Sequence, residues 1–451
     1  MEQPSSKIPT NRSDTQLMKN SSPVYVLFLA GVAACLSAAP VEARWSLKPR
    51  VYAEAQYDDN ILLSAENEQD DLITTVAPGL SLAHESPTDE VNLDYQFLHS
   101  FFRENSELDY SGHIGRLRAH KDFGRLGFDL AEVFLRSENP VELTGLVTFE
   151  RPSLRRGERF RYTRNIVAPE LRFRFGEGRS VRLYYRNNLL RNQAGDVADQ
   201  DAHAYGAALA FRINIRNRFD LSYERADRDY GEIVPPQPSR DSEGDIGRIR
   251  YTHAFDPRIA VFTEYRYDGR DFERETPGFF DYTTHDPRLG VTYELDDRTR
   301  LSASAGYAVR EAEEGRDQET FSGRVDLTGQ RGRLELEAYG ETGFDEDFVS
   351  AELLGFYEFW RAGLRATFPL LERLSLEGYF YFERDEFDDM DRRDRILSGR
   401  ATLSYQLLRW LSVSLHYQRI ERSSDVSSEE FEDNRALARV TVEHDFLQEA
   451  P

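Results

Sequence analysis

Long stretches in which apolar and polar residues alternate are the feature that most limits the folds open to this chain. In residues 411–418, LSVSLHYQ, every odd-numbered position is apolar or aromatic and every even-numbered position is polar. The same period of two recurs in residues 301–309, 333–340 and 374–384. Because successive side chains of a strand point to opposite faces, this pattern predicts long β-strands with one apolar face.

Two kinds of connection alternate between these strands. Nine short ones, chosen for their turn residues or their spacing, recur at intervals of roughly 35–55 residues. They are Ser86–Asp89, Asp122–Gly124, Gly176–Gly178, Asn214–Asn217, Asp256–Arg258, Asp296–Arg298, Gln330–Gly332, Leu370–Arg373 and Leu407–Trp410. The other connections are longer, polar and often acidic, as in residues 231–245 and 383–394. Nine short turns predict ten hairpins, and therefore about twenty strands within a range of roughly 16–22.

Long strands with short turns at one end and long loops at the other predict an all-β fold, a transmembrane antiparallel up-and-down β-barrel. A membrane-spanning strand has one apolar face toward lipid and one polar face toward the water-filled lumen, so its mean hydropathy is low. The low mean hydropathy of this chain therefore agrees with the predicted fold. A β-propeller would need four short strands per repeat, and this chain has two long ones. A soluble secreted protein of several sheets is the alternative.

The first 43 residues have the features of a secretory signal peptide. Lys19 precedes an apolar run at Val24–Ala39, and small residues lead to a predicted cleavage site after Ala43. Met18 is a second candidate start, and the VAAC that ends at Cys35 offers lipoprotein processing as an alternative. The predicted domains are a signal peptide at 1–43 and an outer-membrane β-barrel at 44–451.

The number of cysteines and the net charge exclude several kinds of site and partner. Cys35 is the only cysteine, so the mature chain is predicted to lack disulfides and thiolate sites. The net charge of −23 remains after removal of residues 1–43, which hold three basic and three acidic groups. Such an acidic chain repels a phosphate backbone, so we expect no nucleic-acid partner. The nine histidines show no pair at metal-ligand spacing, and we expect no metal and no cofactor.

Catalysis has little support in the sequence, and we predict that the protein is not an enzyme. No Gly-x-Ser-x-Gly elbow occurs, although a Ser, His and Asp triad assembled across strands stays open as an alternative. Acidic segments such as residues 64–71 and 427–434 are interpreted as solvated loop surface. Weak calcium binding, or contact with lipopolysaccharide through divalent cations, is the alternative for them, and none fits the twelve-residue calcium loop.

The alternation also predicts which side chains line the lumen. Leu171, Phe173 and Leu183 are placed toward lipid, which turns the residues between them inward. The lumen candidates are Arg172, Arg174, Arg182, Tyr184, Arg186, Arg212, Arg248, Arg250, Arg266, Glu335, Glu337 and Glu377. An arginine-rich wall would attract anionic sugars or carboxylates, as charged rings do in selective pores. The alternative is that these Arg and Glu residues pair across strands and keep a hydrated lumen in shape.

Four tyrosines are also predicted to face the lumen, where their rings would offer flat surfaces for sugars: Tyr184, Tyr339, Tyr379 and Tyr381.

Near the C-terminus, apolar and polar residues alternate in residues 436–446, which end in the aromatic Phe446. This resembles the terminal strand signal by which outer-membrane barrels are recognised for assembly, although five residues follow the phenylalanine.

The stretch Tyr52–Glu85 resembles the opening of a family of outer-membrane β-barrel porins, beta-barrel porin 2-like, some of which are associated with exopolysaccharide gene clusters. The shared features are an aromatic-Asp-x-Asn strand end, an Asp-hydrophobic-x-Thr strand and a Pro-Gly. Here Tyr57–Asn60, Asp71–Thr74 and Pro78-Gly79 supply them. Within the first, Asp58-Asp59-Asn60 is interpreted as the place where a strand leaves its sheet, with a calcium site as the alternative.

This resemblance implies a multi-pass barrel in the bacterial outer membrane that serves exopolysaccharide secretion or the passage of polar or anionic saccharides. A general solute porin and a plugged structural or adhesive barrel are the alternatives. The implied partners are outer-membrane lipids and lipopolysaccharide, the barrel assembly machinery, and a saccharide polymer or export partners.

Overall fold

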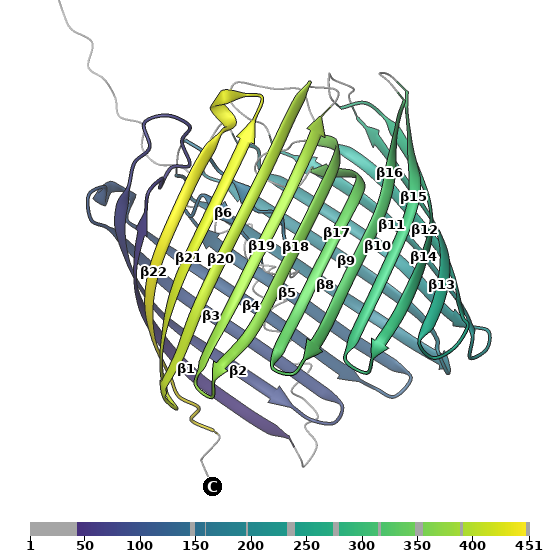
Figure 1. Ribbon diagram of the computed structural model, residues 1–451, viewed down its shortest axis with the longest axis horizontal. Coiled ribbons are helices and arrows are strands. Elements are labelled where there is room, and N and C mark those ends of the chain that lie inside the picture. The colour runs from purple at the N-terminus through teal and green to yellow at the C-terminus, as the bar shows by residue number, and fades with distance from the viewer. Residues whose placement is uncertain are drawn as a thin grey trace, which may run out of the picture.

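The computed structural model describes residues 43–144, 149–157, 159–194, 197–231, 240–273, 279–313, 317–347, 355–387 and 391–447. Within them the chain forms one antiparallel sheet of twenty strands that closes on itself (Figure 1). The predicted fold class and strand number are confirmed. Almost all of the predicted signal peptide lies outside the described residues, and it stays a prediction.

The strands of the barrel follow one another around the wall in chain order, except that the short β6 and β7 form a separate pair. Their bounds are β1 Arg44–Asp58, β2 Asp71–Glu85, β3 Asp89–Phe102, β4 Tyr110–Asp122, β5 Leu126–Ser137, β6 Val141–Glu142, β7 Ser153–Leu154, β8 Tyr162–Gly176, β9 Arg179–Asn192, β10 Gln200–Arg212, β11 Asn217–Tyr230, β12 Ser242–Ala254, β13 Ile259–Phe272, β14 Tyr282–Asp296, β15 Thr299–Ala312, β16 Gln318–Arg331, β17 Leu334–Asp347, β18 Gly355–Leu371, β19 Leu374–Phe387, β20 Arg392–Leu408, β21 Leu411–Ser424 and β22 Phe431–Glu443. Among the residues that the structure describes, two single-turn 3₁₀ segments, η1 Ser106–Leu108 and η3 Ser427–Glu429, accompany them. No helix in the described ranges is long and apolar enough to cross a membrane.

All nine predicted short turns join consecutive strands at one end of the barrel. The two placed by spacing alone are among them, since β18 ends at Leu371 and β19 begins at Leu374, and β20 ends at Leu408 and β21 begins at Leu411. In outer-membrane barrels the short turns face the periplasm and the longer loops face outward. This rule orients the molecule, with the turn end at the bottom of Figure 1.

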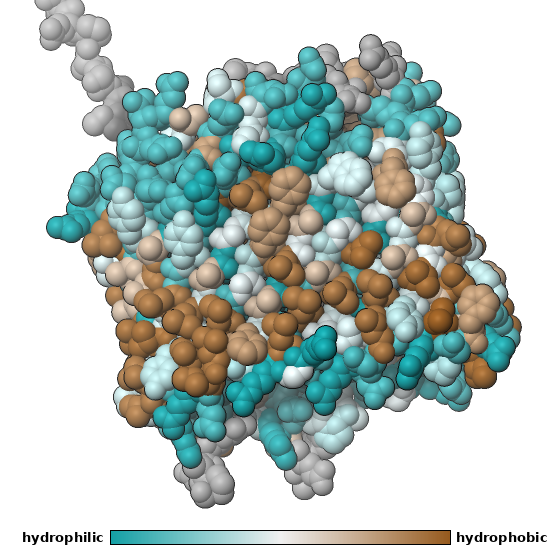
Figure 2. All heavy atoms as spheres, viewed as in Figure 1, coloured by the Kyte–Doolittle hydropathy of each residue, from teal (hydrophilic) through white to brown (hydrophobic). Residues whose placement is uncertain are grey.

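The outward face carries the apolar surface that a membrane requires. Along β9, Leu183 and Tyr185 are 54% and 38% exposed, and the next outward residue toward the loops is Asn187. The Tyr185 hydroxyl lies 2.7 Å from Nδ1 of His203, and Tyr265 pairs with His285 at the same distance. Such amphipathic rings mark the membrane interface. Figure 2 shows the resulting apolar band near the turn end, with hydrophilic residues above it.

The segment Asp58-Asp59-Asn60 closes the barrel. β1 pairs with β22 as well as with β2, and Asp58 is the last residue of β1. The backbone N–H and the side-chain amide of Asn434 donate to the Asp59 carboxylate at 2.6 and 2.9 Å. The Asn60 amide donates to the carbonyl of Glu432 at 2.9 Å. The motif therefore ties the first strand to the last. No three His, Cys, Asp or Glu side chains among the described residues are placed to hold a metal ion.

Replacing Asn60 with Ala is expected to lower the urea concentration at which the barrel unfolds. Asn60 is fully buried, and its amide also bonds to both backbone groups of Ser64. Each buried polar group left without a partner costs about 1–3 kcal/mol. The shift is measured in detergent by tryptophan fluorescence and by heat-dependent migration on gels, with the exposed Glu66→Gln as control. An unfolding midpoint equal to that of the wild type would contradict the assigned role.

Candidate conduit and its lumen

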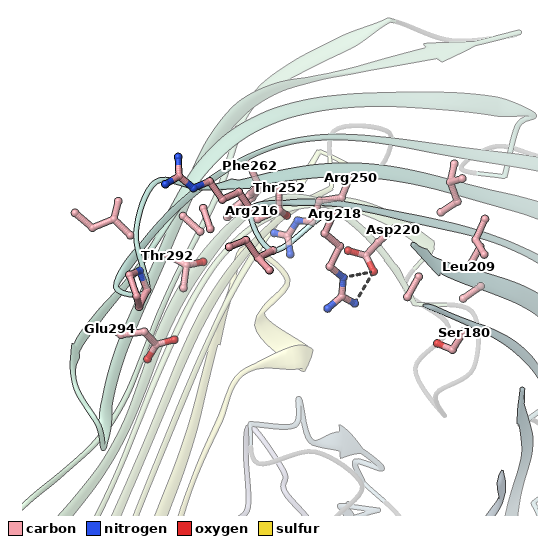
Figure 3. A pocket seen from close by; sticks show the side chains of 18 of the residues that line it. Ser180, Leu209, Arg216, Arg218, Asp220, Arg250, Thr252, Phe262, Thr292 and Glu294 are labelled. Atoms are coloured by element: carbon pink, nitrogen blue, oxygen red, sulfur yellow. Dashed lines mark hydrogen bonds and ion pairs between the residues drawn. The ribbon is translucent and has the colours of Figure 1, made fainter. Parts of the chain in front are cut away.

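The lumen contains a cavity of about 1130 Å³ at the short-turn end, built by strands β8 to β15. Figure 3 shows Arg218 of β11, Arg250 of β12 and Arg216 of the turn between β10 and β11 beside it. Eight arginines and three acidic residues line it: Arg172, Arg182, Arg216, Arg218, Arg248, Arg250, Arg258 and Arg300, with Asp220, Asp256 and Glu294. The cavity wall is therefore cationic, although the whole chain is strongly acidic.

Several of these arginines share their carboxylate partners. Oε1 of Glu170 lies 2.8 Å from the Arg172 guanidinium, and Oε2 lies 3.5 Å from that of Arg182. Glu264 lies 2.9 Å from Arg250 and also contacts Arg248. Cross-strand pairing of Arg and Glu is therefore present. Because one carboxylate serves two guanidinium groups in both places, a positive charge remains on the wall.

The structure brings Arg172, Arg182, Arg248 and Arg250 together around this cavity. The remaining lumen candidates lie outside its lining: Arg174, Tyr184, Arg186, Arg212, Arg266, Glu335, Glu337 and Glu377. Most of them pair locally. Arg266 lies 2.7 Å from Asp268, for example, and Glu377 lies 2.9 Å from Arg365.

The described parts of the connection between β5 and β8 lie inside the barrel. Its short strands β6 and β7 pack Val141 and Leu154 against Leu63, Ile420 and Phe431, which come from the first loop and the last two strands. These contacts join parts of the chain that are far apart in sequence. We call the described residues of this connection, 139–144, 149–157 and 159–161, the infolded segment.

A buried ion cluster fixes the near end of the infolded segment. The Arg155 guanidinium donates to the Glu142 carboxylate at 2.6 Å, and Arg164 of β8 contacts the same carboxylate. Burial raises the pKa of Glu142, but the two guanidinium groups outweigh it and hold the pKa below its usual range. Glu142 therefore stays ionised at neutral pH and keeps both arginines in place.

The far end of the infolded segment reaches the opposite wall. The Phe149 ring lies 4.6 Å from the Tyr339 ring and 5.9 Å from the Tyr379 ring, and the Arg151 guanidinium donates to Asp385 at 2.9 Å. β5 is the fifth strand of the barrel in chain order, and β17 and β19 are the fifteenth and seventeenth of twenty. The segment therefore crosses the lumen, which sequence reasoning missed. The unusually apolar stretch 143–149, LTGLVTF, is the signal that could have revealed it.

The loop end of the β17–β18 hairpin also bends inward. β17 pairs with β16 only as far as Thr342, and Gly343 follows with a φ of 151°, a conformation that favours glycine. Beyond it, Glu346 lies 2.8 Å from Arg228 of β11 and contacts Arg270 of β13. Residues 343–346, which we call the hairpin end, thus contact the inner wall several strands away.

Three of the four tyrosines predicted as sugar platforms are covered in this structure. Phe149 lies against Tyr339 and Tyr379, and Tyr381 is 1% exposed and contacts Glu383. The infolded segment and the hairpin end occupy the lumen toward the loops, and the cationic cavity occupies the turn end. The arrangement is that of a conduit whose outer half is narrowed by these two elements.

Comparison with known proteins places this barrel in a family. A profile of the family described as "Putative beta-barrel porin 2" matches residues 207–444, more than half of the chain. No curated protein matches the sequence.

Two similar solved structures support the fold. The siderophore receptor PirA from Pseudomonas aeruginosa has 11% identity and a TM-score of 0.52, over 90% of this chain and 81% of that one. The ferric enterobactin receptor PfeA, in complex with BCV-L6, has 10% identity and a TM-score of 0.52, over 90% and 82%. At such identities the likeness shows the fold alone. With its closed barrel and its family match, the chain is a non-enzymatic β-barrel of the bacterial outer membrane, and it belongs to the beta-barrel porin 2 family.

Proposed function

We propose that this porin-family barrel conducts anionic saccharides across the outer membrane and serves exopolysaccharide secretion. The arginine-lined cavity carries the proposal. Guanidinium groups pair with carboxylates through two parallel hydrogen bonds, and carboxylates are the charges of acidic polysaccharides. At about 1130 Å³ the cavity exceeds the ~300–1,000 Å³ of a typical small-molecule pocket, as a polymer segment would require.

The position of the arginine-lined cavity supports export as the direction. The cavity lies at the turn end, which faces the periplasm in barrels of this kind. Exposed acidic residues lie in the loops at the other end, as at Glu66, Glu68 and Asp70 of the first one. A polyanion would be attracted to the cavity from the periplasm and repelled by these acidic loops.

Replacing Arg172, Arg248 and Arg250 together with Ala is expected to weaken binding of hexagalacturonate by more than about tenfold. A hydrogen bond to a charged group contributes about 1.5–3 kcal/mol, and three such donors are lost. Isothermal titration calorimetry on the detergent-solubilised barrel measures the change. Arg125→Ala, in a turn outside the cavity, is the matched control. Equal affinity of the triple variant and the wild type would overturn the assignment of the cavity.

A plugged structural barrel is the second candidate, because two inward-folded elements occupy the outer half of the lumen. The hexagalacturonate titration separates the two. A saccharide conduit binds the polyanion through its arginine-lined cavity, and a structural barrel binds none.

A further inference from the structure

The Phe149 ring occupies a flat slot in the inner wall of β17, β18 and β19. One side of the slot is the Tyr339 ring, at a centroid distance of 4.6 Å and an interplanar angle of 36°. The other is the Tyr379 ring, stacked at 5.9 Å and 22°. Gly363 lies between them, where a Cβ atom would collide with the rings of Phe149 and Tyr339. The wall is therefore shaped to take one flat ring, and the segment supplies that ring itself.

Charged and polar groups surround the slot. The Arg324 guanidinium lies 5.5 Å from the Tyr339 ring, and that of Arg400 lies 5.4 Å from the Tyr379 ring. The carboxylate of Glu377 lies 3.6 Å from the Arg400 guanidinium. Aromatic rings with charged groups close by suit a pyranose ring, whose C–H face packs on an aromatic ring while its hydroxyls reach donors and acceptors.

We propose that this slot is a saccharide subsite, that Phe149 fills it when no substrate is present, and that an arriving sugar ring displaces Phe149 and releases the infolded segment. The proposal rests on the proposed function and adds to it how the conduit opens. A sugar ring and Phe149 compete for one place, so binding of saccharide favours the state in which Phe149 has left the slot and the far end has lost one of its attachments.

The contacts of the infolded segment explain why release at this slot would open the lumen without unfolding the segment. Phe149 and Arg151 attach its far end to the wall of β17 and β19. Its near end is held separately, by the Arg155–Glu142 pair and by Leu154 in its apolar cluster. Once Phe149 has left the slot and the ion pair of Arg151 with Asp385 has parted, the far end can swing away while the near end stays docked.

Three variants test the subsite, with maltohexaose as an uncharged probe and hexagalacturonate as an anionic one. Phe149→Ala empties the slot, and we expect it to raise maltohexaose affinity about tenfold, because no displacement is needed. Gly363→Leu fills the slot, and we expect it to abolish maltohexaose binding while raising single-channel conductance. Tyr379→Ala is expected to weaken maltohexaose binding. Tyr205→Ala, on the outer face, is the control, and heat-dependent gel migration confirms that each variant is folded.

The two probes keep the subsite and the proposed function apart. Maltohexaose binding that is unchanged in both Phe149→Ala and Gly363→Leu would overturn the subsite. Hexagalacturonate binding that depends on Arg172, Arg248 and Arg250 would still uphold the proposed function in that case. Loss of maltohexaose binding in Gly363→Leu together with a rise in conductance is the result that only a shared slot explains.

Discussion

Replacing residues 143–151 with a short Gly-Ser linker is expected to raise the single-channel conductance in planar bilayers by at least about tenfold. The replacement removes Phe149 and Arg151, which attach the infolded segment to the far wall, and keeps Glu142 and Leu154, which anchor its base. Barrels of 16–18 strands already enclose an aqueous channel, so a barrel of twenty strands has ample width once the crossing is removed.

The control for this change is the same linker in place of Glu66–Glu68, which are exposed in the first loop. That variant should conduct like the wild type, because these residues lie outside the infolded segment. A shortened segment that leaves conductance at the wild-type level would show that the lumen is closed by something else, and would favour the plugged barrel.

Glu346→Ala is expected to lower the free energy of unfolding by about 3–5 kcal/mol, the cost of removing one partner from a buried ion pair. Glu346 contacts Arg270, which is fully buried, and lies 2.8 Å from Arg228. The Tyr282 hydroxyl also donates to it. Without the carboxylate, two guanidinium groups repel each other at the inner wall, and the β17–β18 hairpin end loses its anchor. Urea unfolding in detergent micelles measures the loss.

Glu346→Gln provides a graded comparison, since it keeps the shape and one hydrogen-bond acceptor but removes the charge. We expect its unfolding midpoint to fall between those of the wild type and the Ala variant. Glu311→Ala, at an exposed position of β15, should match the wild type. If Glu346→Ala unfolds at the wild-type urea concentration, the hairpin end is held by other contacts.

The alternation of residues was enough to predict the barrel because each strand must present apolar side chains to lipid and polar ones to water. The turns at Leu370–Arg373 and Leu407–Trp410 carry no turn signature, and the regular spacing of the strands alone predicted them. The observed strand ends confirm both turns. The family was also recognised correctly, from residues 52–85. The family match covers residues 207–444, so independent parts of the chain support it.

The crossing of the lumen by the infolded segment was beyond sequence reasoning for a physical reason. Phe149 meets Tyr339 and Tyr379, and Arg151 meets Asp385, about 190 to 234 positions later in the chain. Local periodicity carries no information on such pairs. Local periodicity was equally silent on Asp59, which accepts hydrogen bonds from Asn434 where the first strand meets the last. It was also silent on the covering of the two tyrosine rings by the infolded segment.

The reversal potential of the variant with the shortened infolded segment, in a tenfold KCl gradient across a planar bilayer, tests the central claim most directly. If the barrel is a conduit whose arginine-lined cavity selects anions, the current should reverse at a potential of the sign set by chloride. Adding Arg172→Ala, Arg248→Ala and Arg250→Ala should move that potential toward zero. A potential of the sign set by potassium, or the absence of any current, would contradict the account.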